Sequence, residues 1–321
     1  MNLSSKPIGM LAGGLLLTCI LASDTVATDT NPIEIGTVKW GRDFDDAMKR
    51  SEQSDKPMLV LFQEVPGCSG CKAFGKEVLS HPLLVEAIED EFVPVVVYNN
   101  QGEEDAKLLK RFNEPAWNYQ VLRFLDSSGK DVIPRKAGVH SISGVASRMM
   151  EALRASDRDV PLYLESVAAV HDSKKQDLAA FAMHCFWTGE YQLGKIDGVI
   201  ATEAGWHDGR EVTLVRFDRD KVSIDALSQE AAKVRCADRV YTLSGQSVAG
   251  LPSGKLDKDY RTASGSDQKR QLSRFPAAQR IPGINAMQLT KLNAFVPSNA
   301  RQGLRWLSPR QRQALASDQQ K

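Results

Sequence analysis

The fold is decided by residues 58–71, which read MLVLFQEVPGCSGC. The run opens with an unbroken series of apolar residues, and so short a continuous run predicts a strand that is buried on both faces. Residues 65–67 then break the strand, and apolar residues at helical spacing follow over residues 74–79. Cys68 and Cys71 are therefore expected at a junction between a strand and a helix.

The segments downstream continue this pattern. Strand-like runs occur at residues 92–98 and 119–125. Apolar residues then recur at four-residue spacing from Val145 to Leu153, which predicts a helix that packs on the sheet. A β-α-β unit followed by a β-β-α unit predicts an α/β domain over about residues 35–155.

The two cysteines have the spacing that thiol–disulfide chemistry requires. A thiolate at the start of a helix faces unsatisfied backbone N–H groups and the positive end of the helix dipole, which lowers its pKa and makes it nucleophilic. Two intervening residues let the second sulfur reach the first. We therefore expect Cys68 to be the exposed, attacking thiol and Cys71 to be the more buried, resolving thiol.

Two other interpretations of this pair stay open, half of a zinc site and a structural disulfide. Zinc would need two further ligands, and the sequence holds no second pair of cysteines at this spacing. Attachment of haem is excluded because Lys72, and not a histidine, follows Cys71. We predict no metal and no cofactor.

This region resembles the thioredoxin-like superfamily. The matching stretches are FQEVPGC at residues 62–68, the helix up to VLSHP at 78–82, EFVPV at 91–95 and FLD at 124–126. More closely, VPGCSGC at residues 65–71 resembles the VPGUxxT family of thioredoxin-like (seleno)proteins. The resemblance implies that Cys68 stands where that family can carry selenocysteine and Cys71 where it has threonine. Thioredoxins have a cis-proline just before the strand that ends in Phe-Leu-Asp, whereas residues 118–121 here read NYQV, which leaves the choice of substrate open.

A second region, over about residues 176–300, has a different order of elements. A strand-like run at residues 199–205 leads into Asp208-Gly209, which is a strong hairpin signal, and a return strand follows. Apolar residues on one helical face then predict a helix over residues 223–235. We expect a small α+β domain here.

The second region resembles peptide methionine sulfoxide reductase of the A type. The matching stretches are HCFWTGE at residues 184–190, TEAGW at 202–206 and the segments 211–218 and 223–235. The resemblance implies that Cys185 attacks the sulfoxide sulfur and that Glu190 donates a proton to the leaving oxygen. It also implies that Phe186 and Trp187 hold the methyl group, and that Cys236 resolves the sulfenic acid as a disulfide.

This region also departs from that family. His184 replaces the glycine before the nucleophile, and the long glycine-rich insert after residues 205–206 is absent. The Gln-Tyr-Arg segment of the family has its counterpart in QKR at residues 268–270, which lacks the tyrosine hydroxyl that would bind the sulfoxide oxygen. A reaction needs its oxygen-binding donors as well as its nucleophile. We therefore favour a degenerate domain in which Cys185 and Cys236 are buried or paired structurally.

The N-terminus has the pattern of a signal peptide. Lys6 precedes an apolar run at residues 8–22 that is too short to span a bilayer comfortably, and small residues would allow cleavage after Ala27. We expect residues 1–27 to direct export to the periplasm or out of the cell; an uncleaved anchor is the alternative. The 41 Lys and Arg nearly balance the 40 Asp and Glu, so nothing indicates a nucleic-acid partner.

The remaining segments are predicted to be a linker at residues 156–175 and a mobile tail at 301–321. Together these features predict an exported thiol–disulfide oxidoreductase that uses Cys68 and Cys71 on protein thiols or disulfides, with no membrane span after removal of the signal. One alternative is a fused reductase of methionine sulfoxide in proteins, and another is a non-catalytic scaffold. The direction of electron flow depends on how each redox form is stabilised, which leaves it open.

Overall fold

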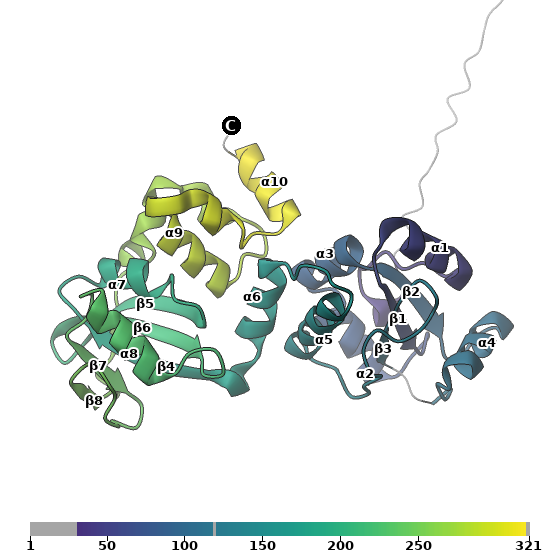
Figure 1. The fold of residues 1–321 in the computed structure, drawn as a ribbon, viewed down its shortest axis with the longest axis horizontal. Helices are drawn as coiled ribbons and strands as arrows, with labels where there is room; N and C mark the ends of the chain where they lie inside the picture. The colour runs from purple at the N-terminus through teal and green to yellow at the C-terminus, as the bar shows by residue number, and fades with distance from the viewer. Residues whose placement is uncertain (1–30, 118–119, 319–321) are drawn as a thin grey trace, which may run out of the picture. The chain divides into compact units, whose positions relative to one another are not determined.

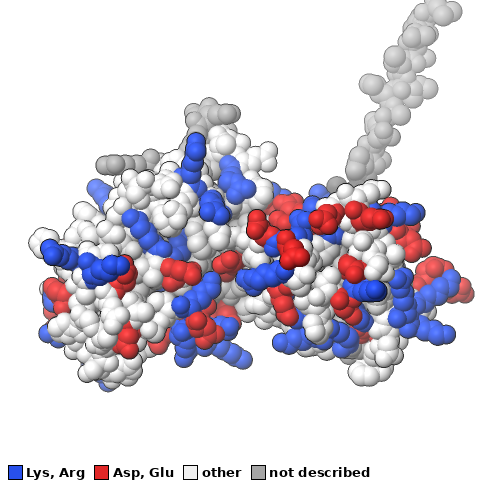
Figure 2. Space-filling view, in the orientation of Figure 1, with Lys and Arg blue, Asp and Glu red and all other residues white. Residues whose placement is uncertain are grey.

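The computed structural model describes residues 31–117 and 120–318. The expected signal peptide at residues 1–27 lies outside this range. Within it, no helix combines the length and the apolar character needed to cross a lipid bilayer. Lys and Arg side chains are interspersed with Asp and Glu over the face shown in Figure 2, in line with a net charge of +1.

The N-terminal part alternates strands and helices, as the sequence predicts (Figure 1). Its elements in chain order are α1 (Phe44–Ser54), β1 (Met58–Gln63), α2 (Ser69–Ala73), a π-helical turn (Phe74–Val78), α3 (Pro82–Glu91), β2 (Val93–Tyr98), α4 (Glu103–Phe112), β3 (Val121–Leu125) and α5 (Ile142–Ala155). The strands form a sheet in the order β2-β1-β3. β1 is parallel to β2 and antiparallel to β3.

β1 is buried along its whole length because each face of the sheet is covered. Leu59 and Leu61 pack in a cluster with residues of α3 and α5. Met58, Val60 and Phe62 pack in a second cluster with residues of α1 and α4. Burial of apolar surface stabilises such a layer by about 25 cal/mol per Å². The central strand thus holds the segment that follows it, residues 64–68, in a fixed place.

The expected linker contains a helix, α6 (Leu162–His171). Tyr163, Leu164 and Val167 from this helix are buried in the same cluster as Leu59. The spacing of these three residues places them on one helical face, so α6 packs on the first domain. The domain limits at residues 155 and 176 stay predictions.

The second region contains a larger, mixed sheet. Its elements are β4 (Gln176–Ala182), α7 (Phe186–Leu193), β5 (Val199–His207), β6 (Arg210–Asp218), α8 (Ile224–Lys233), β7 (Arg239–Thr242), β8 (Ser253–Lys255), β9 (Arg261–Thr262) and α9 (Ala286–Leu304). The strands lie in the order β8-β7-β4-β6-β5-β9. β5 and β6 form the hairpin that Asp208-Gly209 predicts, and both turn residues have positive φ, at 51° and 69°.

The segment expected to be a mobile tail forms a further helix, α10 (Pro309–Asp318). Leu315 packs with Leu292 and Leu307 in an apolar cluster. The Ser308 hydroxyl donates to the Glu86 carboxylate at 2.5 Å, and the Arg310 N–H donates to the same group at 2.7 Å. Residues 309–318 therefore form a helix that makes specific contacts, and the limits of the tail stay a prediction.

Candidate functional site

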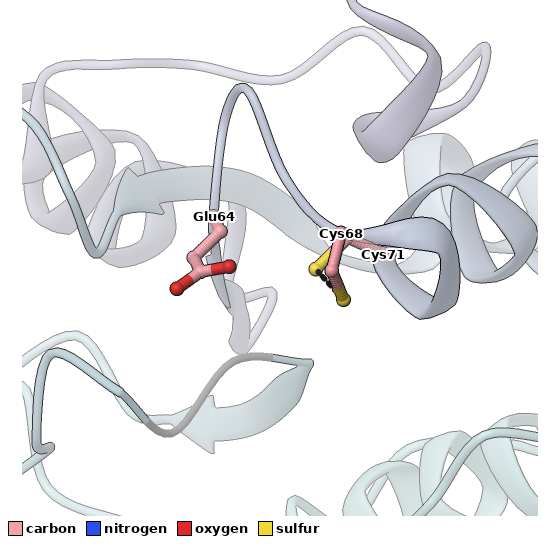
Figure 3. A group of neighbouring side chains, drawn as sticks. All are labelled: Glu64, Cys68 and Cys71. Atoms are coloured by element: carbon pink, nitrogen blue, oxygen red, sulfur yellow. Dashed lines mark hydrogen bonds between the residues drawn. The ribbon is translucent and has the colours of Figure 1, made fainter.

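Cys68 and Cys71 lie at the junction between β1 and α2. Cys68 is the residue directly before α2, and Cys71 lies in its middle. Their Sγ atoms are 3.5 Å apart, and a dashed line marks this contact in Figure 3. Cys68 is exposed, whereas Cys71 has 0% exposure. The structure thus places one accessible sulfur in contact with one buried sulfur.

The loop between β1 and α2 brings Gly67 against Cys71. A Cβ atom on Gly67 would lie 2.6 Å from the Cys71 Cβ and 2.9 Å from its Sγ, so only glycine fits there. The Gly67 N–H donates to the buried Glu34 carboxylate at 3.0 Å. The Gln63 side chain, at the end of β1, donates to the Glu34 carbonyl at 2.6 Å and to the Cys71 carbonyl at 3.3 Å. These bonds fix the loop on both sides of the cysteine pair.

The surroundings shift the pKa values of the two thiols in opposite directions. The pKa of Cys68 is lowered, chiefly by the backbone N–H of Cys71 and next by the Cys71 thiol. Burial raises the pKa of Cys71 to about 11. Hydrogen bonds to a thiolate stabilise its charge, whereas loss of solvent destabilises it. Cys68 is therefore the group that ionises first and is open to a partner.

Gln120 lies beside the pair, directly before β3. It has a positive φ of 63°, an uncommon conformation for a residue with a Cβ atom. Its buried amide nitrogen has no conventional hydrogen-bond partner among the described residues, yet it is close enough to Cys71 to oppose the rise in that thiol's pKa. The segment that ends at Gln120 lacks a proline, and no sequence motif marks Gln120 as part of the site.

Glu64 is a second residue that the sequence analysis missed. Its carboxylate and the two sulfurs all lie within 4.8 Å of one another, on the same side of the loop in Figure 3. Its negative charge raises the pKa of Cys68 and partly offsets the hydrogen bonds that lower it. An acidic residue at the end of a strand, four positions before the first cysteine, was the available signal.

The aromatic residues of the second region gather at the start of α7. Cys185 is half-buried and precedes this helix. The Phe186 ring lies 5.8 Å from the Trp187 ring and 5.7 Å from the Trp206 ring. The Arg270 guanidinium lies over Trp187 at 5.3 Å, and the Trp187 indole N–H donates to the Asp267 carbonyl at 3.0 Å. The structure therefore brings the segment around Gln268–Arg270 to the aromatic pair.

Glu190 is fully buried and paired with Lys269. The Lys269 ammonium donates to Oε1 at 2.5 Å, and the Lys269 backbone N–H donates to Oε2 at 2.9 Å. Burial raises the pKa of Glu190, while the Lys269 charge opposes that rise. Lys269 thus donates a hydrogen bond to both oxygens of this carboxylate. The resemblance to the sulfoxide reductase assigns the same carboxylate the role of proton donor.

Cys236 lies in an apolar cluster with Phe181, Leu227 and Ala231. Burial raises the pKa of its thiol to about 11. Cys185 and Cys236 are both free thiols in the structure. The role of Cys236 as a resolving cysteine stays a prediction.

A comparison with known protein families supports a thioredoxin-like fold for the first domain. A family model described as thioredoxin-like matches residues 39–126. Among solved structures, a DsbH oxidoreductase aligns with 41% of this chain and 96% of its own chain, at 22% identity and a TM-score of 0.32. No curated protein matches the chain. Residues 39–126, with the strand–helix junction that carries both cysteines, form a thioredoxin-like domain.

Proposed function

We propose that the chain is an exported thiol–disulfide oxidoreductase that acts on protein thiols or disulfides through Cys68 and Cys71. The observation that carries the proposal is the asymmetry of two sulfurs only 3.5 Å apart, one exposed and one buried. The predicted signal peptide supports export to the periplasm or the cell exterior. The resemblance to the VPGUxxT family supports the same site, with a thiol at the selenocysteine position.

The geometry supports a two-step exchange. The Cys68 thiolate attacks one sulfur of a substrate disulfide, forms a mixed disulfide and releases one substrate thiolate. Cys71 then loses its proton and attacks the Cys68 sulfur, which forms the Cys68–Cys71 disulfide and releases the second substrate thiolate. Two electrons pass to the substrate. The reverse order of steps oxidises a substrate dithiol, and the reduction potential of the pair decides which direction prevails.

Reduction of insulin by the full chain tests the proposal. We expect Cys68→Ser to abolish the activity because it removes the attacking sulfur. Cys236→Ser is the matched control, since that thiol is buried in the second region, and it should retain the wild-type rate. Equal activity of Cys68→Ser and the wild type would refute the proposal.

We propose further that the second region does not reduce methionine sulfoxide. Lys269 donates a hydrogen bond to each oxygen of the Glu190 carboxylate, so both oxygens are occupied and neither is directed at a bound sulfoxide. A peptide containing methionine sulfoxide should therefore not be turned over. Turnover that is lost in Cys185→Ser would instead establish the fused reductase.

A further inference from the structure

Three donor atoms that suit a metal ion converge at the start of α2. The Sγ atoms of Cys68 and Cys71 and a carboxylate oxygen of Glu64 lie within 4.8 Å of one another. Figure 3 shows all three side chains directed to the same side of the β1–α2 loop. In the described part of the chain, no other set of three or more His, Cys, Asp and Glu side chains places its donor atoms this close together.

The spacing of the sulfurs matches a chelate. Two zinc–sulfur bonds of about 2.3 Å at a tetrahedral angle separate their sulfurs by about 3.8 Å. The Sγ atoms are 3.5 Å apart, so both can bind one ion with a shift of a few tenths of an ångström. A disulfide instead requires a separation of about 2.05 Å. The observed distance is thus closer to the chelate than to the disulfide.

The Glu64 side chain can rotate and is negatively charged, so it can act as the third metal ligand. It is half-buried on a loop, and its carboxylate has no basic partner among the described ion pairs. Rotation of its side chain can bring an oxygen to the distance of about 2.0–2.2 Å that zinc–carboxylate bonds require. A cation at this point would also offset the repulsion between the carboxylate and the Cys68 thiolate.

We propose that Glu64, Cys68 and Cys71 bind one zinc-like divalent cation when the thiols are reduced, with the fourth coordination position open to water or to a substrate sulfur. Binding forms two metal–thiolate bonds and one metal–carboxylate bond, and it releases the remaining thiol protons to solvent. No electron is transferred. Oxidation to the Cys68–Cys71 disulfide removes both thiolate donors and releases the ion, so the metal-bound form and the disulfide exclude each other. The inference and the proposed function use the same reduced thiols, and in this respect the inference rests on the proposed function.

Zinc binding to the reduced full chain tests the inference. We would titrate Zn²⁺ without oxygen, in competition with a chromophoric chelator, and record the thiolate-to-metal absorption of the Co²⁺ form. One ion per chain is expected. Glu64→Gln should weaken the affinity by about 10- to 100-fold, as other changes around metal ligands do. Glu77→Gln, at an exposed position in the adjoining π-helical turn, should bind as the wild type does.

Three results would overturn the inference. The first is a reduced wild type that binds no zinc. The second is equal zinc affinity of Glu64→Gln and the wild type. The third is zinc binding by the oxidised chain that is as tight as binding by the reduced chain. Urea unfolding of Glu64→Gln, with a midpoint equal to that of the wild type, shows that the variant is folded. The insulin assay, run on metal-free protein, reports separately on the proposed function. Loss of insulin reduction with intact binding of one ion would count against the oxidoreductase and for the metal site.

Discussion

Gly67 sets the reactivity of the cysteine pair without taking part in chemistry. The absence of a side chain at this position lets the β1–α2 loop lie against the Cys71 Cβ and Sγ atoms. That contact helps to exclude solvent from Cys71, and the loss of solvent is the main cause of its raised pKa. At the scale of single residues, the difference between the two thiols therefore comes from the backbone that covers one of them.

Replacement of Gly67 by alanine should disturb the site. The added Cβ would lie 2.6 Å from the Cys71 Cβ and 2.6 Å from the Glu64 carbonyl oxygen, so the loop has to move. We expect Gly67→Ala to lower the free energy of unfolding by about 1–3 kcal/mol, the usual cost of overpacking, and to slow insulin reduction. The unfolding free energy is measured by urea denaturation of the reduced protein.

Gly70→Ala is the matched control, because its Cβ would meet the flexible Gln120 amide at 3.3 Å and the Cys68 Sγ at 3.6 Å. This variant should unfold with a free energy close to that of the wild type. If both variants were destabilised equally, close packing at Gly67 would not be the cause.

Among the secondary-structure elements, those with a strong local pattern could be predicted and the others could not. The unbroken apolar run at residues 58–62 identified β1, and Asp208-Gly209 identified the β5–β6 hairpin, because both signals are local. α6 also left a signal, since Tyr163, Leu164 and Val167 share one helical face, but we assigned the segment to a linker. α10 has a local signal too, since Ser308-Pro309 can begin a helix, but its attachment to α3 could not be predicted. Its main anchor, the bond from Ser308 to Glu86, joins residues 222 positions apart.

The site itself was predictable only in part. Cys68 and Cys71 could be found because their spacing and their place after a buried strand are features of the sequence. Glu64 has a local signal, its position directly after β1 and four residues before Cys68. The proximity of Gln120 to the sulfurs depends instead on the path of the chain before β3, which no local pattern encodes.

The contact between the start of α3 and the end of α6 leads to a prediction about how the free energy of unfolding changes in acid. The His81 ring precedes α3 and lies 5.2 Å from the His171 ring at the end of α6. Burial, and next the charge of His171, lower the pKa of His81 to about 4. The ring in the unfolded chain binds a proton near pH 6.5, whereas the folded ring does not until about pH 4. Stability is therefore lost as the pH falls from 6.5 to 4.

We expect His81→Asn to reduce this loss. The difference between pH 7 and pH 4.5 should shrink by on the order of 1–2 kcal/mol, allowing for the solvent that still reaches the ring. Urea denaturation at the two pH values measures it. His184→Gln, at an exposed position, should keep the pH dependence of the wild type. An unchanged slope in His81→Asn would show that His81 is not the titrating group.

At the scale of the whole molecule, Glu86 joins α3 to the start of α10, near the C-terminal end of the described chain. This buried carboxylate on α3 accepts from Ser308 and from the backbone of Arg310, while the Arg310 side chain pairs with Glu89 at 2.6 Å. A buried carboxylate that loses a donor is costly because water does not replace the lost bond. The start of α10 thus contributes to the stability of the first domain.

Ser308→Ala should lower the free energy of unfolding by about 1–3 kcal/mol. Ser317→Ala, at an exposed position in α10, should change it by less than about 0.5 kcal/mol. Chemical denaturation of both variants at neutral pH provides the comparison. Equal stability of Ser308→Ala and the wild type would mean that this bond does not hold α10.

The central claim is that Cys68 attacks and that Cys71 resolves, and covalent trapping tests it most directly. The Cys71→Ser and Cys68→Ser variants are each incubated with oxidised insulin, quenched in acid and mapped by mass spectrometry of their peptides. Cys71→Ser should accumulate a mixed disulfide at Cys68, because no second thiol can displace the substrate. Cys68→Ser should carry no adduct at Cys71, which has 0% exposure. An adduct at Cys71 in equal yield, or no adduct at Cys68, would contradict the account.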